Sequence, residues 1–154
     1  MTKAMFRMCA MIAMVLAGSQ TTLRAQGPHT LEGTWHVAVT VRDCKTGAII
    51  RTVRSLQMFS RDRSFTETAD TFLRGSSVGA WAHAGGDIHT ATYWFFRYNP
   101  DGTFKSIAEA LDKISLSDDS HFTASGAITD YDANGNPISV GCFTHAATRL
   151  SYPK

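Results

Sequence analysis

The sequence lacks any apolar run long enough to cross a lipid bilayer, which takes about 20 residues as a helix. The run that comes nearest, residues 8–17, is too short and follows Lys3 and Arg7. Basic residues, a short apolar run and then small residues are the pattern of a secretory signal peptide. We predict cleavage after Ala25, with Ser19 as the alternative, and a secreted or periplasmic product without a membrane anchor. A buried N-terminal helix would instead need an amphipathic stripe.

Cysteine is scarce, with Cys9, Cys44 and Cys142 the only three. Cys9 leaves with the predicted signal peptide (residues 1–25), so residues 26–154 keep an even pair. In an oxidising compartment, that pair predicts a disulfide between Cys44 and Cys142, and two free thiols are the alternative. The His residues are scattered without metal-ligand spacing, and the sequence predicts no metal and no cofactor.

An excess of basic charge is also missing. The whole chain has 15 Lys and Arg against 13 Asp and Glu, but Lys3, Arg7 and Arg24 precede the predicted cleavage site and every acidic residue follows it. The mature chain therefore keeps 12 basic and 13 acidic residues, net −1, which argues against a nucleic acid as partner. The sequence contains no phosphate-binding Gly loop and no Gly-x-Ser-x-Gly motif, so no catalytic signature decides whether the protein is an enzyme.

The sequence does contain a marked alternation of apolar and polar residues, interrupted at intervals by turn residues. Asn134-Gly135 between two alternating runs is a strong hairpin signal, and Asn99-Pro100-Asp101-Gly102 marks another turn. A helix over 107–113 is the alternative to a strand there, because Ala, Glu, Leu and Lys favour helices. The predicted strands cover residues 34–42, 48–60, 64–72, 80–84, 87–98, 103–116, 121–132 and 138–150.

Eight strands joined mostly by short turns form either a sandwich or an up-and-down barrel. The cysteines favour the barrel. If the last strand pairs antiparallel with the first and Trp35 faces Arg149, the numbers of facing residues sum to about 184. That register brings Cys44 within about two residues of Cys142, which is inside disulfide reach. The predicted fold is therefore all-β, an eight-stranded antiparallel up-and-down barrel that forms a single domain over residues 26–154.

Two short motifs resemble those of lipocalins and related calycin barrels. Leu31-Glu32-Gly33-Thr34-Trp35 is similar to the family's Gly-x-Trp element in the first strand, and Thr148-Arg149-Leu150 is similar to its closing element. The resemblance implies that Trp35 sits at the closed end of the barrel, with Arg149 packed across it as a cation over an indole.

An eight-stranded barrel is wide enough to be filled by its own side chains or to hold one small ligand. Trp35 and its alternates are taken to face inward, and the later strands are set by their aromatic residues. Large side chains on one wall then face small ones on another, which favours a ligand cavity. Glu67 and His83 fall on the inward phase, where a buried carboxylate needs a partner; a register error of one residue would place both in water. The predicted ligand-binding residues are Phe65, Glu67, Trp81, His83, Trp94, Phe96 and Ala108.

These patterns predict an exported barrel that binds a small hydrophobic molecule in its interior. One alternative is a barrel-type isomerase or cyclase in which Glu67 and His83 transfer protons. Another is an interaction domain with a filled barrel, which acts through the loop at residues 74–79.

Overall fold

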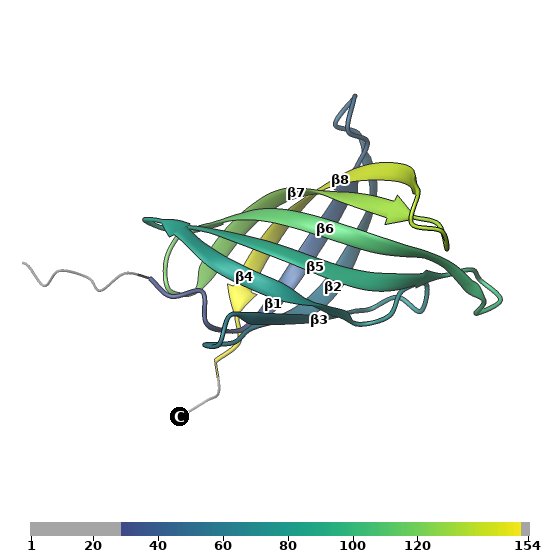
Figure 1. Cartoon of the computed structure of the whole chain (residues 1–154). Coiled ribbons are helices and arrows are strands. Elements are labelled where there is room, and N and C mark those ends of the chain that lie inside the picture. The colour runs from purple at the N-terminus through teal and green to yellow at the C-terminus, as the bar shows by residue number, and fades with distance from the viewer. Residues whose placement is uncertain (1–28, 152–154) are drawn as a thin grey trace, which may run out of the picture.

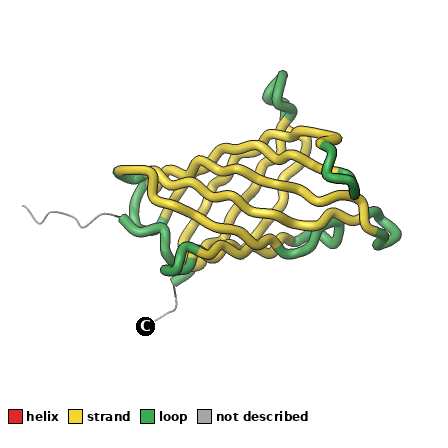
Figure 2. Tube along the Cα trace, viewed as in Figure 1, coloured by secondary structure: helices red, strands yellow, loops and turns green. Residues whose placement is uncertain are grey.

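The computed structural model describes residues 29–151, and all of its regular structure is β-strand (Figures 1 and 2). The predicted signal peptide lies outside these residues. Within them there is no helix that could span a membrane. The strands are β1 (Gly33–Arg42), β2 (Ile49–Phe59), β3 (Ser64–Ala69), β4 (Ser77–Gly85), β5 (Ile88–Tyr98), β6 (Phe104–Leu116), β7 (His121–Tyr131) and β8 (Pro137–Arg149).

The strands form a closed antiparallel barrel in which each pairs with its neighbours in sequence and β8 returns to pair with β1. Trp35 lies opposite Arg149 and Arg42 lies opposite Cys142, which is the register predicted from the sequence. Cys44 and Cys142 form a disulfide with their Cα atoms 5.1 Å apart. The bond ties the β1–β2 turn to β8, beside the strand pair that closes the barrel. The predicted fold class and the predicted disulfide are both confirmed.

The strand boundaries differ most from the predicted ones at β4, which begins at Ser77 rather than at residue 80. The sequence predicts a loop over residues 74–79 because of its Gly and Ser residues. Gly79 instead lies within the strand at a point of close approach: a Cβ built on it would come within 2.1 Å of the Thr92 carbonyl oxygen on β5. Residues 107–113 form a strand and not the alternative helix, because β6 pairs with both β5 and β7.

Aromatic side chains fill one end of the barrel. Trp35, Phe59, Phe65 and Phe122 are all buried. The ring centroids of Trp35 and Phe122 are 4.8 Å apart, and those of Phe59 and Phe65 are 5.0 Å apart. Their edge-on and tilted arrangements are those that aromatic pairs prefer. Trp35 Nε1 also donates a hydrogen bond to the carbonyl oxygen of Leu31, 3.0 Å away, so the segment before β1 is anchored to this end.

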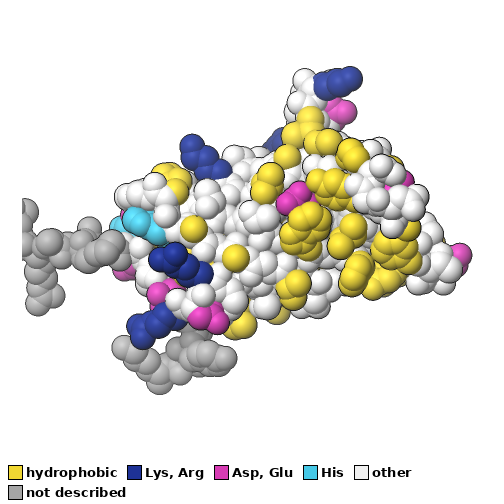
Figure 3. Space-filling view, in the orientation of Figure 1, with side chains coloured by type: hydrophobic (Ala, Val, Ile, Leu, Met, Phe, Trp, Pro, Cys, Tyr) yellow, Lys and Arg dark blue, Asp and Glu magenta, His cyan; other side chains and the backbone are white. Residues whose placement is uncertain are grey.

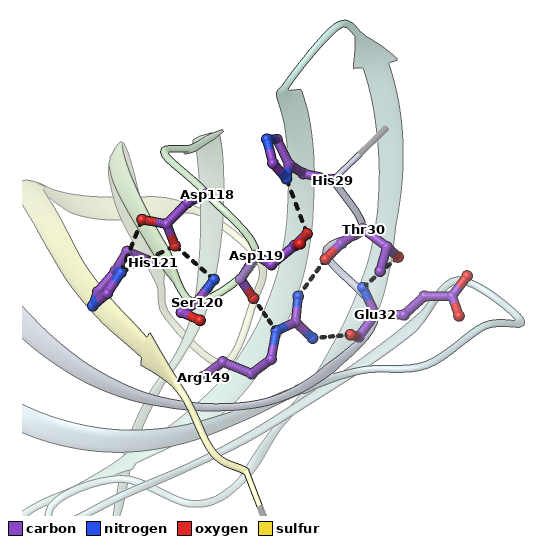
Figure 4. Close-up of polar contacts among 8 residues, drawn as sticks. All are labelled: His29, Thr30, Glu32, Asp118, Asp119, Ser120, His121 and Arg149. Carbon is purple, nitrogen blue, oxygen red and sulfur yellow. Dashed lines mark hydrogen bonds and ion pairs between the residues drawn. The ribbon is translucent and has the colours of Figure 1, made fainter. Parts of the chain in front are cut away.

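Arg149 covers this closed end (Figure 4). Its guanidinium carbon lies 4.1 Å from the centroid of the Trp35 ring. Its nitrogens donate hydrogen bonds to three backbone carbonyl oxygens, those of Thr30, Glu32 and Asp119. Gly33 leaves room for the guanidinium: a Cβ there would lie 2.5 Å from Arg149 Nη1, and its φ of 129° is one that side chains rarely allow. The predicted packing of Arg149 over a buried Trp35 is confirmed.

Candidate functional site

The opposite end of the barrel is open, and a pocket of about 240 Å³ enters it there. We call it the mouth pocket. Its apolar wall includes Val39, Val41, Val53, Phe95 and Ile128. Four cationic side chains and one acidic side chain also line it: Arg51, Arg74, Arg97, Lys105 and Asp130. The pocket therefore combines an apolar wall with an excess of positive charge.

Two of these arginines share one aromatic ring. The guanidinium carbon of Arg74 lies 3.6 Å from the centroid of the Phe95 ring, and that of Arg97 lies 5.1 Å from it. Arg97 Nε donates to Asp130 Oδ1 at 2.5 Å. Burial lowers the pKa of Arg97; Asp130 opposes this effect, and the nearby cations Arg51 and Arg74 add to it. Three guanidinium groups thus converge on the same part of the barrel.

The other two cations, Arg51 and Lys105, lie at the rim. Both are exposed. Neither has a salt-bridge or hydrogen-bond partner among residues 29–151, where Arg97 is paired with Asp130 and Arg74 with Glu67. Their charge is therefore available to an anion that enters the mouth pocket.

Glu67 is buried inside the barrel and contacts Arg74, which lines the mouth pocket. Its carboxylate accepts hydrogen bonds from Gln57 Nε2 at 3.2 Å, from Ser77 Oγ at 2.8 Å and from Arg74 Nη2 at 2.5 Å. Burial alone would raise the pKa of this carboxyl, but Arg74 and the hydrogen bonds from Ser77 and Gln57 outweigh it and hold the pKa below its usual value. Glu67 is therefore ionised, and it holds Arg74 in place.

A second polar group in the barrel, Asp112 with His145, was not predicted from the sequence. The Asp112 Oδ2 and His145 Nδ1 atoms are 3.3 Å apart, and each side chain is only 1% exposed. Burial, with Glu67 nearby, raises the pKa of Asp112 well above its usual value. Burial lowers the pKa of His145 to about 4. Both shifts favour the neutral form of the group, and Tyr93, whose pKa burial raises, lies beside Asp112. The signal in the sequence was the inward phase of β6 and β8, which places residues 112 and 145 inside.

The predicted ligand-binding residues divide into three groups. Phe65, Glu67 and Ala108 are buried inside the barrel as expected, and Trp81 is partly buried, with its Nε1 donating to the Ser60 carbonyl oxygen at 2.9 Å. His83 is exposed, and its Nε2 lies 2.8 Å from the Gly86 carbonyl oxygen at the far end of β4. The structure therefore does not bring Glu67 and His83 together. None of the predicted ligand-binding residues lines the mouth pocket.

Trp94 and Phe96 form the third group, and their predicted inward orientation is wrong. They are 37% and 51% exposed, whereas Tyr93 and Phe95 are buried. Figure 3 shows hydrophobic side chains gathered on the outer surface toward one end of the molecule. With aromatic residues at four successive positions, alternation alone cannot decide which face is inside, and a shift of one residue exchanges the faces.

The pairing of residues across the β5–β6 hairpin would have indicated which face of β5 points inward. Across β5 and β6, facing residues have an odd sum, as in the pairing of Phe95 with Ala108. An inward even position on β6 therefore requires an inward odd position on β5. The prediction used even positions on both strands.

Neither the comparison with protein-family models nor that with curated proteins gives a match for this chain. A closed barrel does not by itself identify the lipocalin family, so that membership stays a prediction. The function must be argued from the side chains of the barrel.

Proposed function

We propose that the protein is an exported carrier or sensor that holds a small amphipathic anion in the mouth pocket. Such a ligand has an apolar body and a carboxylate, sulfonate or similar group. One observation supports this most: a single pocket with an apolar wall carries four cations against one acid. The proposal refines the small hydrophobic ligand predicted from the sequence by adding a negative charge.

The charges around the pocket favour an anionic ligand. Glu67 compensates Arg74 and Asp130 compensates Arg97, which leaves Arg51 and Lys105 without a counter-charge among the described residues. An anion between these groups would relieve the repulsion of like charges, and guanidinium groups bind carboxylates through two parallel hydrogen bonds.

The size of the pocket limits the ligand. Pockets for drug-sized molecules have volumes of about 300–1,000 Å³, and the mouth pocket, at about 240 Å³, lies below that range. We therefore expect a small molecule whose apolar part packs against Val39, Val53 and Ile128. Export is part of the proposal because residues 1–25 read as a signal peptide, and a disulfide is most often kept in an oxidising compartment.

The isomerase alternative has less support, because it requires Glu67 and His83 to act as one pair. Glu67 is instead engaged by Arg74, Ser77 and Gln57. The filled-barrel alternative fits the closed end but not the mouth. The carrier proposal accounts for both the volume of the mouth pocket and the excess of positive charge around it.

The proposal is tested with two fluorescent probes of similar shape, anilinonaphthalene sulfonate and the uncharged phenylnaphthylamine. The mature protein should bind the sulfonate at least about tenfold more tightly, a difference of about 1.4 kcal/mol. The double variant Arg51→Gln/Lys105→Gln should lose most of this preference and keep its affinity for the uncharged probe.

Lys113→Gln is the matched control, because Lys113 is exposed on β6 and does not line the mouth pocket. It removes a positive charge and should leave the affinity for both probes unchanged. Equal affinity of the wild-type protein for both probes, or an equal loss of affinity in the rim and control variants, would reject the proposal.

A further inference from the structure

The middle of the barrel contains buried polar atoms that have no hydrogen-bond partner. They belong to inward-facing side chains of β2, β6 and β8: Ser55 Oγ, Gln57 Oε1, Asp112 Oδ1 and His145 Nε2. The other two polar atoms of the pair, Asp112 Oδ2 and His145 Nδ1, face each other at 3.3 Å, and Tyr93 lies beside Asp112. Buried polar atoms in folded proteins nearly always have a partner, which is either another part of the protein or ordered water. Leaving several of them unpaired would cost a large part of the stability of a domain this small. The cluster therefore points to a molecule that is not part of the chain.

The chemistry of the cluster limits what this molecule can be. Asp112 and His145 are in contact at 3.3 Å with both side chains almost fully buried, so burial favours a neutral pair that holds one proton between Oδ2 and Nδ1. Wherever that proton lies, His145 Nε2 carries the other proton and can donate, while Asp112 Oδ1 can accept. Ser55 Oγ can do either, and Gln57 Oε1 accepts. The cluster thus offers donors and acceptors but no net charge.

A charged ligand is disfavoured here because the one ionised neighbour is already neutralised. Glu67 accepts hydrogen bonds from Arg74, Ser77 and Gln57 and forms a buried ion pair with Arg74. A hydroxyl group, which both donates and accepts a hydrogen bond, matches the remaining atoms.

The cluster adjoins the mouth pocket. His145 lies opposite Val39 in the β1–β8 pairing, and Val39 is part of the wall of the mouth pocket. Phe143, the next inward residue of β8 toward the mouth, stacks on His145 with ring centroids 4.8 Å apart. A Cβ built on Gly126 would lie 2.5 Å from Phe143 Cζ and 3.0 Å from Asp112 Oδ1, so Phe143 also lies close to Asp112. Phe143 therefore lies against the Asp112–His145 pair on the side toward the mouth.

We infer that the centre of the barrel is a second binding site, formed by Ser55, Gln57, Asp112 and His145, for a neutral hydroxyl group. Water supplies this hydroxyl in the ligand-free protein. When a ligand is bound in the mouth pocket, a hydroxyl group at the end of the ligand that reaches past Phe143 displaces this water and takes its place. The first source is independent of the proposed function, and the second rests on it.

The water is detected by oxygen-17 and deuterium magnetic relaxation dispersion of the ligand-free, disulfide-bonded mature protein. The wild-type protein should show at least one internal water that exchanges more slowly than the protein tumbles. The double variant Asp112→Leu/His145→Phe replaces both polar partners by apolar groups of similar size and should lose that contribution. His36→Phe, which changes an exposed His on β1, is the matched control and should keep it. A wild-type protein without dispersion, or equal dispersion in the wild type and the double variant, would overturn the inference.

Two further measurements apply if the double variant does not fold. Nitrogen-15 NMR of the wild-type protein should find His145 with its proton on Nε2 and exchanging slowly with solvent; a freely titrating His145 would overturn the inference. Octanoate and ω-hydroxyoctanoate then distinguish the two sources of the hydroxyl group. Displacement of the internal water by the hydroxy acid alone supports a ligand hydroxyl in the site, and displacement by neither acid supports water as the occupant. Failure of both acids to bind would count against the proposed function while leaving the water site standing.

Discussion

The two ends of the barrel are formed by the same strands but contain opposite kinds of side chain. At the closed end, aromatic rings pack against one another, and the cation over Trp35, Arg149, is held by three backbone carbonyl oxygens. At the mouth, cations outnumber acids around a hollow of about 240 Å³. The closed end therefore supports stability, and the mouth keeps charge and space that stability alone does not require.

The largest effect is expected at the closed end. Trp35→Ala should lower the free energy of unfolding by about 3–5 kcal/mol, because it leaves a cavity among Phe59, Phe65 and Phe122 and removes the ring under Arg149. Trp94→Ala on the outer face of β5 is the matched control and should cost less than about 1 kcal/mol. Urea unfolding of both variants measures the difference, and equal losses would contradict the assignment of the two faces.

The disulfide beside the mouth should have the next largest effect. Replacing both Cys44 and Cys142 by Ser should lower the free energy of unfolding by about 2–5 kcal/mol, because the bond closes a loop of about 100 residues. Thiol labelling of the denatured, unreduced mature protein checks the bond itself. Two reactive thiols per chain would show that it does not form.

The Asp112–His145 pair should make stability depend on pH in a specific window. Protons are counted here relative to ionised Asp112 and neutral His145. Between about pH 4 and 6.5, the folded pair binds one such proton, on Asp112, and the unfolded chain also binds one, on His145, so the free energy of unfolding does not change with pH through this pair. Above pH 6.5 the unfolded chain loses its proton, whereas the folded pair keeps one on Asp112 because burial raises the pKa of that group. The free energy of unfolding should then fall by about 1.4 kcal/mol per pH unit until Asp112 ionises.

The control for this slope is the double variant Asp112→Leu/His145→Phe. The difference between the wild-type and variant free energies of unfolding isolates the pair from the other titrating groups. Parallel curves from pH 5 to pH 9 would show that Asp112 and His145 are not a buried neutral pair.

The smallest effect on stability, and a large one on binding, is expected from Gly141→Leu. Gly141 lines the mouth pocket, and a Cβ built there meets no atom within 4 Å. The added side chain should fill the hollow and abolish binding of anilinonaphthalene sulfonate without unfolding the barrel. Ala146→Leu, at an exposed position of the same strand, should leave binding intact. Unchanged binding to Gly141→Leu would place the ligand elsewhere.

The closed end was predictable from the sequence because its features are local or linked by one register. Gly33, Trp35 and Arg149 lie in short motifs, and Cys44 and Cys142 fixed the pairing of the first and last strands. The barrel and its closure followed from these residues and from the alternation of the strands.

The mouth was not predictable in the same way. Its cations come from β2, β5, β6 and the β3–β4 connection, and no spacing in the sequence shows that they converge. Tyr93 to Phe96 are aromatic on both faces of β5, so the pattern gave the wrong face for Trp94 and Phe96. Asp112 and His145 lie far apart in the sequence, and only the closed barrel brings them into contact.

Isothermal titration of the mature protein with octanoate and with octanol tests the central claim most directly, because the two ligands share an alkyl chain and differ in the charged group. The account predicts that octanoate binds at least about tenfold more tightly than octanol, and that added salt weakens the binding of octanoate alone. Equal affinity for the two ligands, or an octanoate affinity that does not respond to salt, would contradict the assignment of the mouth pocket as a site for a small amphipathic anion.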